Sequence, residues 1–412
     1  MISQIAGSNQ PRMNTLLVVP WDEKRGGVIS VVENLARYLQ ARGHGVLFFH
    51  NGRTVLLKNR LTQLGFSGVQ LRLNMPFGSG LRGVLRTLAF PFLFTASILQ
   101  LIWFLRTRRI QIVNVHYPDD SCVYFAICSW LLSIRLVTSV HGRDAFYREK
   151  PKEKYSSAFR FLIHSSDLVI LPSDAYRGKL LEAFPGIPHK TIFIHNGVNP
   201  AQFKPAENGQ NTNENKRYIL CVAELQEYKA IDVLLHAAKP LLTSDRSLTL
   251  VLAGDGPLRV ELESLASSLG IRNQTVFLGT QGATAVASLL HSCETMVLPS
   301  RMEPFGIVLI EGMACKKPVV ASAVGGIPEI IEHEVSGILV EPENPQALAA
   351  GLRRVLTDGD LRRTIDENGY SRVMERFCSS HSGAAYEKAF ASILGFEPPS
   401  PTSPSKVPVT GF

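Results

Sequence analysis

Cysteine is scarce in this sequence, and its spacing excludes two classes of site. None of the six cysteines belongs to a C-x-x-C motif or has a histidine partner at metal-ligand spacing. We therefore expect reduced core cysteines rather than a disulfide framework or a structural zinc. The residues concerned are Cys122, Cys128, Cys221, Cys293, Cys315 and Cys378.

Targeting and nucleic-acid signals are also missing. The stretch MISQIAGSNQPRMN has no sustained apolar segment of the kind that a secretory signal needs, so we expect a cytoplasmic protein. No helix-turn-helix, RNP or zinc-finger spacing accompanies the basic residues, which makes nucleic acid the weakest candidate partner.

Length and charge indicate two unlike halves. A chain of 412 residues, 45% hydrophobic and 19% charged, is long for one core and fits two domains. Residues 1–205 hold 25 Lys and Arg against 11 Asp and Glu, a net charge of +14, whereas the remainder has a net charge of −6. A basic half favours an anionic membrane or an acidic substrate as partner, although an excess of surface Lys and Arg with no binding role would give the same net charge.

Strand-like and helix-like segments alternate along the chain, which predicts an α/β protein with two Rossmann-like, doubly wound domains. We place the domains at 1–205 and 217–378, with an Asn-, Pro- and Lys-rich linker at 206–216. Two helical segments are expected after Glu341, the last of them at 379–396. The Pro- and Ser-rich tail at 397–412 is predicted to be disordered.

The first predicted unit is a strand, a glycine turn and a helix. NTLLVVP (14–20) has the pattern of a buried parallel strand, and VISVVENLARYLQ carries apolar residues at helical spacing until Gly43. Between them, Gly26 and Gly27 would let backbone N–H groups approach a ligand, although a simple tight turn would use the same residues.

An uncharged run of 19 residues, Thr87–Leu105, lies between flanking arginines. Its length does not exclude a membrane-spanning helix. However, the run lies between strands of one predicted sheet, which a span would divide between the two sides of a bilayer. We interpret it as a buried crossover helix, with an in-plane interfacial helix as the alternative and a spanning helix as the least favoured.

Two later strand patterns, IQIVNVH and RLVTSVH, each end in a histidine. Open α/β sheets bind ligands at the carboxyl ends of their strands. We expect His116 in the core or behind the site, and His141 at the site itself. The basic cluster that follows His141 contains the acceptor-side candidates Arg143 and Lys150.

The most informative stretch is LPSRMEPFGIVLIEGMACKKPVVASAVGGIPEII (298–331), which has the punctuation of a βαβ unit. The first-turn N–H groups of its helix, around 306–308, favour an anion such as a diphosphate. Glu311 on the helix can accept hydrogen bonds from paired ribose hydroxyls, and Glu303 before it can meet sugar hydroxyls. A nucleotide-sugar suits this arrangement, although two solvated helix-end carboxylates would have the same spacing.

This stretch resembles the donor-site signature of the retaining, GT-B-fold glycosyltransferases of family GT4, also called group 1. GG…NLARYLQARGHGV resembles the family's first βα unit, HGRD the position beside the donor sugar, and HNGVN the junction between domains. The resemblance implies sugar transfer from a nucleotide-sugar without a bound metal or cofactor. It also implies an acceptor-side domain at 1–205, a donor domain at 217–378 and a last helix, 379–396, that returns to the first domain. It implies catalytic roles for Glu303, His141 and Lys229. The donor-binding residues that we expect are Gly26, Gly27, Gly254, Arg301, Phe305, Gly306, Ile307, Val308 and Glu311.

One position departs from the family pattern. The strand YILCVA is usually followed by an Arg and then by Lys-Gly, whereas this chain has Glu224, Lys229 and Ala230 there. Lys229 can still contact a diphosphate, but Glu224 would repel it. Losing one charged hydrogen bond costs about 1.5 to 3 kcal/mol, roughly 10- to 100-fold in donor affinity, unless Arg301 or a basic residue of the first domain replaces it.

The first half also suggests the acceptor. Its charge and its Arg-flanked apolar run favour a lipid-diphosphate-linked glycan for cell-surface polysaccharide, with peripheral attachment to the inner face of the plasma membrane. The alternatives are a soluble saccharide acceptor, an integral membrane anchor, a GT-B epimerase acting on UDP-N-acetylglucosamine, and a weakly active or non-catalytic sugar-nucleotide-binding module.

Overall fold

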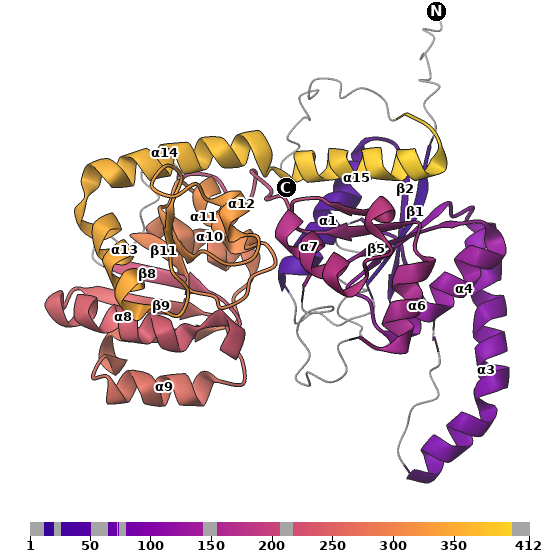
Figure 1. Cartoon of the computed structure of the whole chain (residues 1–412), viewed down its shortest axis with the longest axis horizontal. Helices are drawn as coiled ribbons and strands as arrows, with labels where there is room; N and C mark the ends of the chain where they lie inside the picture. Colours follow the sequence, from indigo (N-terminus) through magenta and orange to yellow (C-terminus); the bar gives the residue numbers. More distant parts are fainter. Residues whose placement is uncertain are drawn as a thin grey trace, which may run out of the picture.

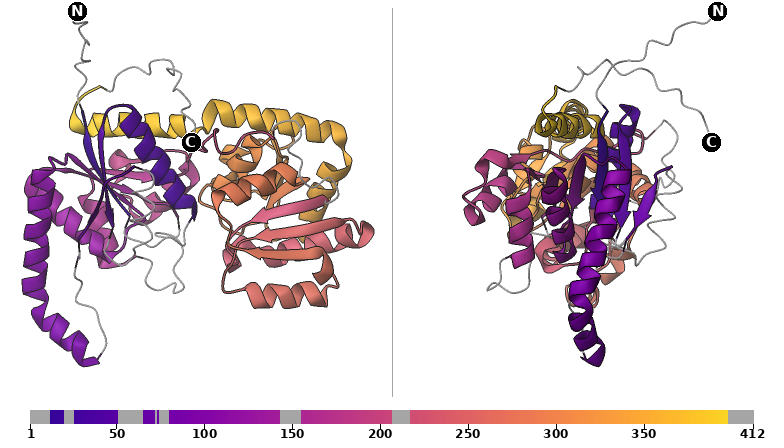
Figure 2. Two further views of the ribbon diagram at one scale, coloured as in Figure 1. Left: turned by 180° about the vertical axis from the view of Figure 1, so that it is seen from behind. Right: turned by 90° about the vertical axis from the view of Figure 1, so that its right-hand side faces the viewer.

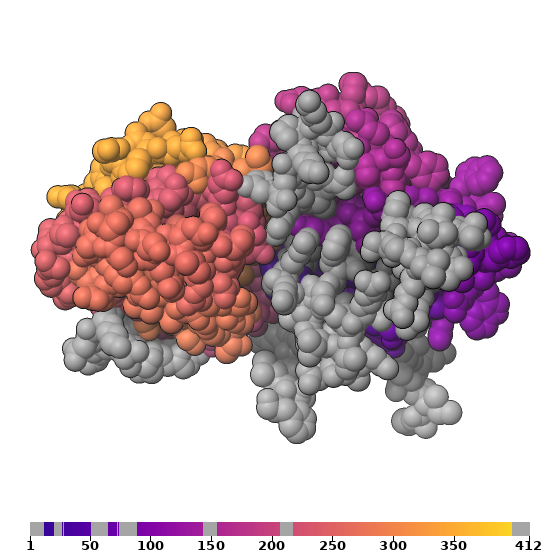
Figure 3. All heavy atoms as spheres, turned by 90° about the horizontal axis from the view of Figure 1, so that it is seen from below, coloured from indigo at the N-terminus to yellow at the C-terminus, as the bar shows by residue number. Residues whose placement is uncertain are grey.

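The computed structural model describes residues 12–19, 26–50, 65–71, 73, 80–142, 155–206 and 217–397. These residues form two parallel sheets with flanking helices, in two domains that lie side by side (Figures 1 and 3). The predicted α/β class with two doubly wound sheets is confirmed. Arg143, Lys150, residues 207–216 of the predicted linker and residues 398–412 of the tail lie outside the described residues, so the predictions for them stay open.

In the described part of the first domain, the sheet has seven strands in the order β3-β2-β1-β4-β5-β6-β7. Its order reverses between β1 and β4, which is where open parallel sheets bind ligands. The first domain contains β1 (Asn14–Val18), α1 (Gly26–Ala41), β2 (Gly45–His50), β3 (Gly68–Gln70), α3 (Gly80–Thr107), β4 (Ile112–His116), α4 (Val123–Leu132), β5 (Arg135–Ser139), α6 (Ser157–Ser165), β6 (Leu168–Leu171), α7 (Asp174–Ala183) and β7 (Thr191–Phe193).

The second sheet has six strands in the order β10-β9-β8-β11-β12-β13, which reverses between β8 and β11. This part of the chain contains β8 (Arg217–Val222), α8 (Ile231–Ser244), β9 (Leu248–Ala253), α9 (Arg259–Ser268), β10 (Thr275–Gly279), α10 (Ala283–Ser292), β11 (Thr295–Leu298), α11 (Ile307–Ala314), β12 (Val319–Ser322), α12 (Ile327–Ile330), β13 (Ile338–Val340), α13 (Pro345–Thr357), α14 (Gly359–Arg376) and α15 (Ser379–Leu394).

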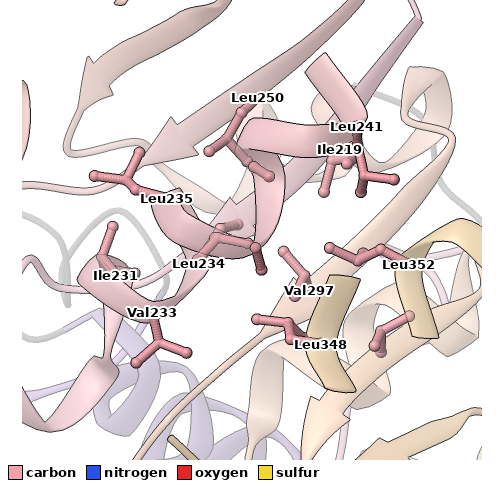
Figure 4. Packing of buried hydrophobic residues seen from close by; sticks show 14 of the residues in the cluster. Ile219, Ile231, Val233, Leu234, Leu235, Leu241, Leu250, Val297, Leu348 and Leu352 are labelled. Atoms are coloured by element: carbon pink, nitrogen blue, oxygen red, sulfur yellow. The ribbon is translucent and has the colours of Figure 1, made fainter. Parts of the chain in front are cut away.

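Buried aliphatic residues hold helices on both faces of the second sheet. On one face, α8 and α13 pack side chains such as Leu234 and Leu348 against strand residues such as Val297 (Figure 4). On the other face, Leu309 and Met313 anchor α11 in a second cluster. Helix α11 is therefore fixed to the sheet by its buried side, and its N-terminal end has a defined position.

Between Glu341 and the last described residue, 397, lie three helices, where the sequence predicted two helical segments. The last of them, α15, packs against α1 of the first domain (Figure 1). A Cβ atom on Gly383 would lie 2.3 Å from Cγ of Tyr38, so only glycine allows this approach. Buried Glu387 accepts hydrogen bonds from Tyr38 Oη at 3.1 Å and Arg42 Nε at 3.2 Å, and its carboxylate lies 2.9 Å from Nε2 of His44. These polar contacts fix the returning helix.

The expectation that Thr87–Leu105 is a buried crossover helix is half wrong. It lies in α3, which connects β3 to β4 of one sheet, but only 22% of the apolar window Ala89–Thr107 is buried. Phe92, Leu99 and Trp103 are 82%, 61% and 67% exposed. Figures 1 and 2 show α3 along the outside of the first domain, with its N-terminal end extending past it. By length and composition this helix could cross a membrane, but both of its ends lead into the same sheet.

All six cysteines are buried and none forms a disulfide. Their predicted place in the core is therefore confirmed.

Candidate functional site

Two of the predicted catalytic residues meet at the switch point of the second sheet. Lys229 ends the short turn Glu227–Lys229 after β8, and Glu303 follows the neighbouring strand β11. Lys229 Nζ lies 2.5 Å from Glu303 Oε2, and the side chains are 14% and 10% exposed. Ser300 Oγ donates to the same carboxylate oxygen over 3.3 Å. The structure thus pairs the cation predicted for the diphosphate with the carboxylate predicted for the sugar.

A Gly-Gly turn after β12 supports the Glu303 backbone. Gly325 has a φ of +54°, and a Cβ atom there would lie 2.0 Å from the carbonyl oxygen of Glu303. The N–H of Gly326 donates to that carbonyl over 3.1 Å. Glycine is required here because the two loops approach each other backbone to backbone.

Helix α11 begins beside Glu303. Its N-cap, Gly306, has a φ of +106° and offers no side chain to the first turn. Opposite it lies the start of α1, because a Cβ atom on Gly27 would be 3.6 Å from Cδ1 of Ile307. The N-terminal ends of α1, at Gly26, and α11 therefore approach each other across the domain junction. Helix N-termini carry positive potential and N–H donors, so this place favours an anion.

Glu311 lies one turn further along α11 and is partly buried. Burial raises the pKa of its carboxyl from the ordinary value of 4.5 to about 8. The neutral form of this carboxyl therefore persists to a higher pH than that of an exposed glutamate. A carboxyl held in this way can exchange hydrogen bonds with neighbouring hydroxyl groups.

His141 reaches the site from the first domain. Gly142 follows it with a φ of +121°, and a Cβ atom on Gly142 would lie 2.0 Å from Cγ of Pro304. A second contact between the domains is made by Ser173, whose Oγ donates to the carbonyl oxygen of Pro304 over 2.7 Å. These contacts bring His141 next to the turn that carries Glu303.

His116 lies buried directly behind His141, as expected. Its Nδ1 is 3.0 Å from Nε2 of His141, and the two rings are stacked with centroids 5.3 Å apart. Burial, and then the neighbouring His141, lower the pKa of His116 well below its ordinary value. Burial lowers the pKa of His141 to about 4. Both imidazoles are therefore neutral at physiological pH.

Two of the predicted donor-binding side chains lie differently from the expectation. The guanidinium of Arg301 is held by both carboxylate oxygens of Asp232, at 3.0 and 2.7 Å, and by Glu343 at 2.6 Å. It is thus paired with two carboxylates in this structure, and its role as the second cation stays a prediction. The side chain of Phe305 is buried against His195 and Phe377, so only its backbone can face a ligand.

The glycine at 254 has a packing role within the second domain. Its φ is +155°, and a Cβ atom there would lie 1.8 Å from the carbonyl oxygen of Ala223. Close by, Glu224 accepts a hydrogen bond from the hydroxyl of Tyr228 over 3.0 Å. Glu224, the carboxylate at the position where the family usually has Arg, is therefore hydrogen-bonded within its own turn.

Sequence reasoning missed Glu329, which joins the two domains. The first N–H groups of α7, at Asp174 and Ala175, donate to its carboxylate over 3.1 and 2.9 Å. Its Oε2 lies 2.7 Å from His195 Nε2, within the HNGVN segment. Glu329 belongs to the GGIPEII part of the motif, but its partners are more than 130 residues away, so no local pattern pointed to the contact.

The described residues contain no group of three or more His, Cys, Asp or Glu side chains placed to hold a metal ion. The site combines the largely buried Lys229–Glu303 ion pair, two helix N-termini, Glu311 and a neutral histidine. Such a set can bind an anion next to a hydroxyl-bearing ligand.

Two family models match the chain consecutively. The model for glycosyltransferase family 4 covers residues 25–202, and the model for group 1 glycosyl transferases covers residues 203–372. An uncharacterized glycosyltransferase of Methanocaldococcus jannaschii is 31% identical over 266 residues, which are 64% of this chain and 71% of that protein. A second glycosyltransferase of that organism is 36% identical over 255 residues, 58% of this chain and 65% of its own length.

A longer match is N-acetyl-alpha-D-glucosaminyl L-malate synthase of Bacillus anthracis, 27% identical over 90% of this chain and 94% of the synthase. Among solved structures, a glycosyltransferase from Rickettsia africae aligns with a TM-score of 0.76 and 21% identity, over 93% of this chain and 99% of that one. Anabaena HepE in complex with UDP and glucose aligns with a TM-score of 0.75 and 23% identity, over 92% and 100%. These structures show that the two-sheet architecture is the GT-B fold.

Proposed function

The chain belongs to the group 1 glycosyltransferases of family GT4, and we propose that it moves a sugar from a nucleotide-sugar to an acceptor at the junction of its two domains. The observation that carries the proposal is the buried Lys229–Glu303 pair, which lies beside the N-terminus of α11 and across from His141. No bound metal or cofactor is required in this proposal, and the reaction takes place in the cytoplasm.

In the proposed reaction, the bond between the sugar C1 and the diphosphate oxygen breaks, and the acceptor oxygen bonds to C1 on the same face. The acceptor proton passes to the departing phosphate. Lys229 and the first-turn N–H groups of α11 stabilise the negative charge that develops on the leaving group. Glu303 binds sugar hydroxyls, Glu311 binds the ribose, and His141 closes the sugar pocket from the first domain.

The Lys229–Glu303 ion pair has a consequence for donor binding. Because Lys229 is bonded to Glu303, it must turn from this carboxylate to the diphosphate when the donor arrives. Arg301 is held by Asp232 and Glu343, so we expect the two facing helix N-termini to supply the remaining positive potential.

Binding of donor candidates tests this proposal directly. A panel of nucleotide-sugars is screened by thermal stabilisation of the wild type, starting with UDP-sugars because the similar HepE structure holds UDP and glucose. We expect Lys229→Ala and Glu311→Ala to weaken binding of the stabilising donor by about 10- to 100-fold, because each loses a polar or charged contact with the donor. Asp366→Asn, on α14, is the matched control. Equal stabilisation of all three variants would contradict the site.

We further propose that the acceptor is a lipid-linked glycan, as in cell-surface polysaccharide synthesis, and that α3 lies on the membrane surface. The α3 stripe, Phe92, Leu99 and Trp103, faces outward on one side of the helix. On neighbouring α4, Trp130 is 82% exposed. Three exposed arginines, Arg106, Arg108 and Arg109, lie at the C-terminal end of α3 and directly after it. An apolar stripe next to basic residues suits an anionic bilayer surface, to which each basic residue adds about 1 kcal/mol.

Vesicle co-sedimentation tests the surface proposal. The wild type is expected to bind phosphatidylglycerol vesicles and to bind phosphatidylcholine vesicles weakly. Replacing the α3 stripe with serines should release the protein from the vesicles, because most of the apolar area that the bilayer would bury is lost. Val260→Ser, an exposed apolar residue of the second domain, is the matched control and should bind as the wild type does. Equal recovery with both lipids, or unchanged binding of the stripe variant, would favour a soluble acceptor.

A further inference from the structure

A chain of buried polar groups runs from α15 to His141. The hydroxyl of Tyr386 donates to Ser139 Oγ over 3.4 Å, and Ser139 Oγ donates to Asn114 Oδ1 over 2.9 Å. Asn114 Nδ2 is 2.8 Å from Nε2 of His116. His116 Nδ1 is in turn 3.0 Å from Nε2 of His141. Tyr386, Ser139, Asn114 and His116 are all buried, so these groups depend on one another for hydrogen bonds.

Donors and acceptors along this chain can be assigned in one direction, from Tyr386 toward His141. The Ser139 hydroxyl accepts from Tyr386, so its own proton goes to the carbonyl oxygen of the Asn114 amide. The NH2 group of Asn114 then faces His116 Nε2, which must accept because an amide NH2 has no free lone pair. A neutral His116 therefore carries its proton on Nδ1 and donates it toward His141.

The same reasoning fixes His141. Its Nε2 accepts from His116, so a neutral His141 carries its proton on Nδ1. The reverse direction would require Asn114 to turn its amide over. The NH2 group would then face the hydroxyl of Ser139, whose proton would lose its acceptor in this chain.

We propose that Asn114 and His116 are positioning residues, which hold His141 as the Nδ1-protonated tautomer in a fixed ring orientation beside the Glu303–Pro304 turn. Nδ1 of His141 is then a hydrogen-bond donor rather than an acceptor. The chain also links this donor to α15, the helix that returns from the second domain, through Tyr386. This inference rests on the proposed function for its effect on catalysis, whereas the tautomer itself is a property of the protein without substrate.

The tautomer is measured by 15N NMR of the full chain labelled at histidine, because protonated and unprotonated ring nitrogens have well separated shifts. The His141 signals are assigned by their absence from His141→Asn. Two substitutions at 116 are then compared: His116→Leu removes the donor, and His116→Asn places an amide NH2 close to the position of Nδ1. Thermal unfolding shows whether each variant is folded.

We expect the proton of His141 on Nδ1 in the wild type and in His116→Asn, and a mixture of both tautomers in His116→Leu. With a donor that the enzyme turns over, kcat of His116→Leu should fall about 10- to 100-fold with little change in KM for the nucleotide-sugar, and His116→Asn should recover most of it. A proton on Nε2 in the wild type, or an unchanged tautomer in folded His116→Leu, would overturn the proposal. If no nucleotide-sugar is turned over, the proposed function fails, but the NMR result still decides the tautomer.

Discussion

Glu311→Gln replaces a partly buried carboxyl with a neutral side chain of almost the same shape. In the native protein, burial raises the pKa of this carboxyl from 4.5 to about 8. The native state therefore holds the proton more tightly than the unfolded chain does. As the pH rises from about 4.5 to about 8, the wild type loses stability relative to the glutamine variant, and the difference levels off above that range.

The size of the effect follows from the shift. At about 1.4 kcal/mol per pKa unit, a change from 4.5 to about 8 sets an upper limit of about 5 kcal/mol. Glu311 is partly exposed, so water reduces the cost of its charge, and we expect about 2 kcal/mol at pH 9. The variant should be nearly as stable as the wild type at pH 5 and more stable at pH 9.

Urea unfolding between pH 5 and pH 9 measures this difference. Asp366→Asn is a matched control, because burial raises the pKa of Asp366 to about 7, and this residue lies on α14. Both variants should remove part of the pH dependence, but only Glu311→Gln should also weaken binding of the nucleotide-sugar. A Glu311→Gln protein whose stability follows the wild type at every pH would refute the buried state of this carboxyl.

The remaining predictions concern how the domains are held together and how His141 is placed. Glu387→Ala leaves Tyr38, Arg42 and His44 without their shared acceptor and should lower the free energy of unfolding by about 3 kcal/mol, whereas Arg363→Ala, which breaks an exposed ion pair, should cost less than about 0.5 kcal/mol. Urea unfolding checks both values, and similar losses would contradict the role of the buried carboxylate. Gly142→Ala forces a Cβ atom against Pro304 at a positive φ and should cost about 2 kcal/mol and most of the transfer activity, whereas Gly186→Ala meets no atom within 4 Å and should be nearly neutral. A Gly142→Ala enzyme with wild-type stability and rate would show that the domain junction can move apart without loss.

Most of the strands could be predicted from the sequence because each is an apolar run that ends at a glycine, proline or histidine. The run 14–20 contains β1, and the helix predicted after the glycine turn runs from Gly26 to Ala41. The motif also brought Lys229 and Glu303 forward as partners of one ligand, and the structure places them in contact. Periodic burial and glycine turns are local properties, so a single sequence records them.

Contacts between distant segments could not be predicted in this way. Arg301 lies within the motif, but its partner Asp232 is 69 residues away, so the sequence did not show that the guanidinium is already engaged. For α3, an uncharged run does not reveal whether any neighbour covers it. The polar chain to His141 did leave a signal, because Asn114 and His116 alternate along β4 and so lie on the same face of the strand.

The most direct test of the proposed chemistry is the rate at which Glu303→Gln releases nucleoside diphosphate from the nucleotide-sugar in the presence of its acceptor. The substitution keeps the shape of the side chain but removes the charge that pairs with Lys229 and the strong acceptor for sugar hydroxyls. We expect a fall of about 100-fold or more relative to the wild type, in a variant that stays folded. A rate equal to that of the wild type would contradict a reaction site at the Lys229–Glu303 pair.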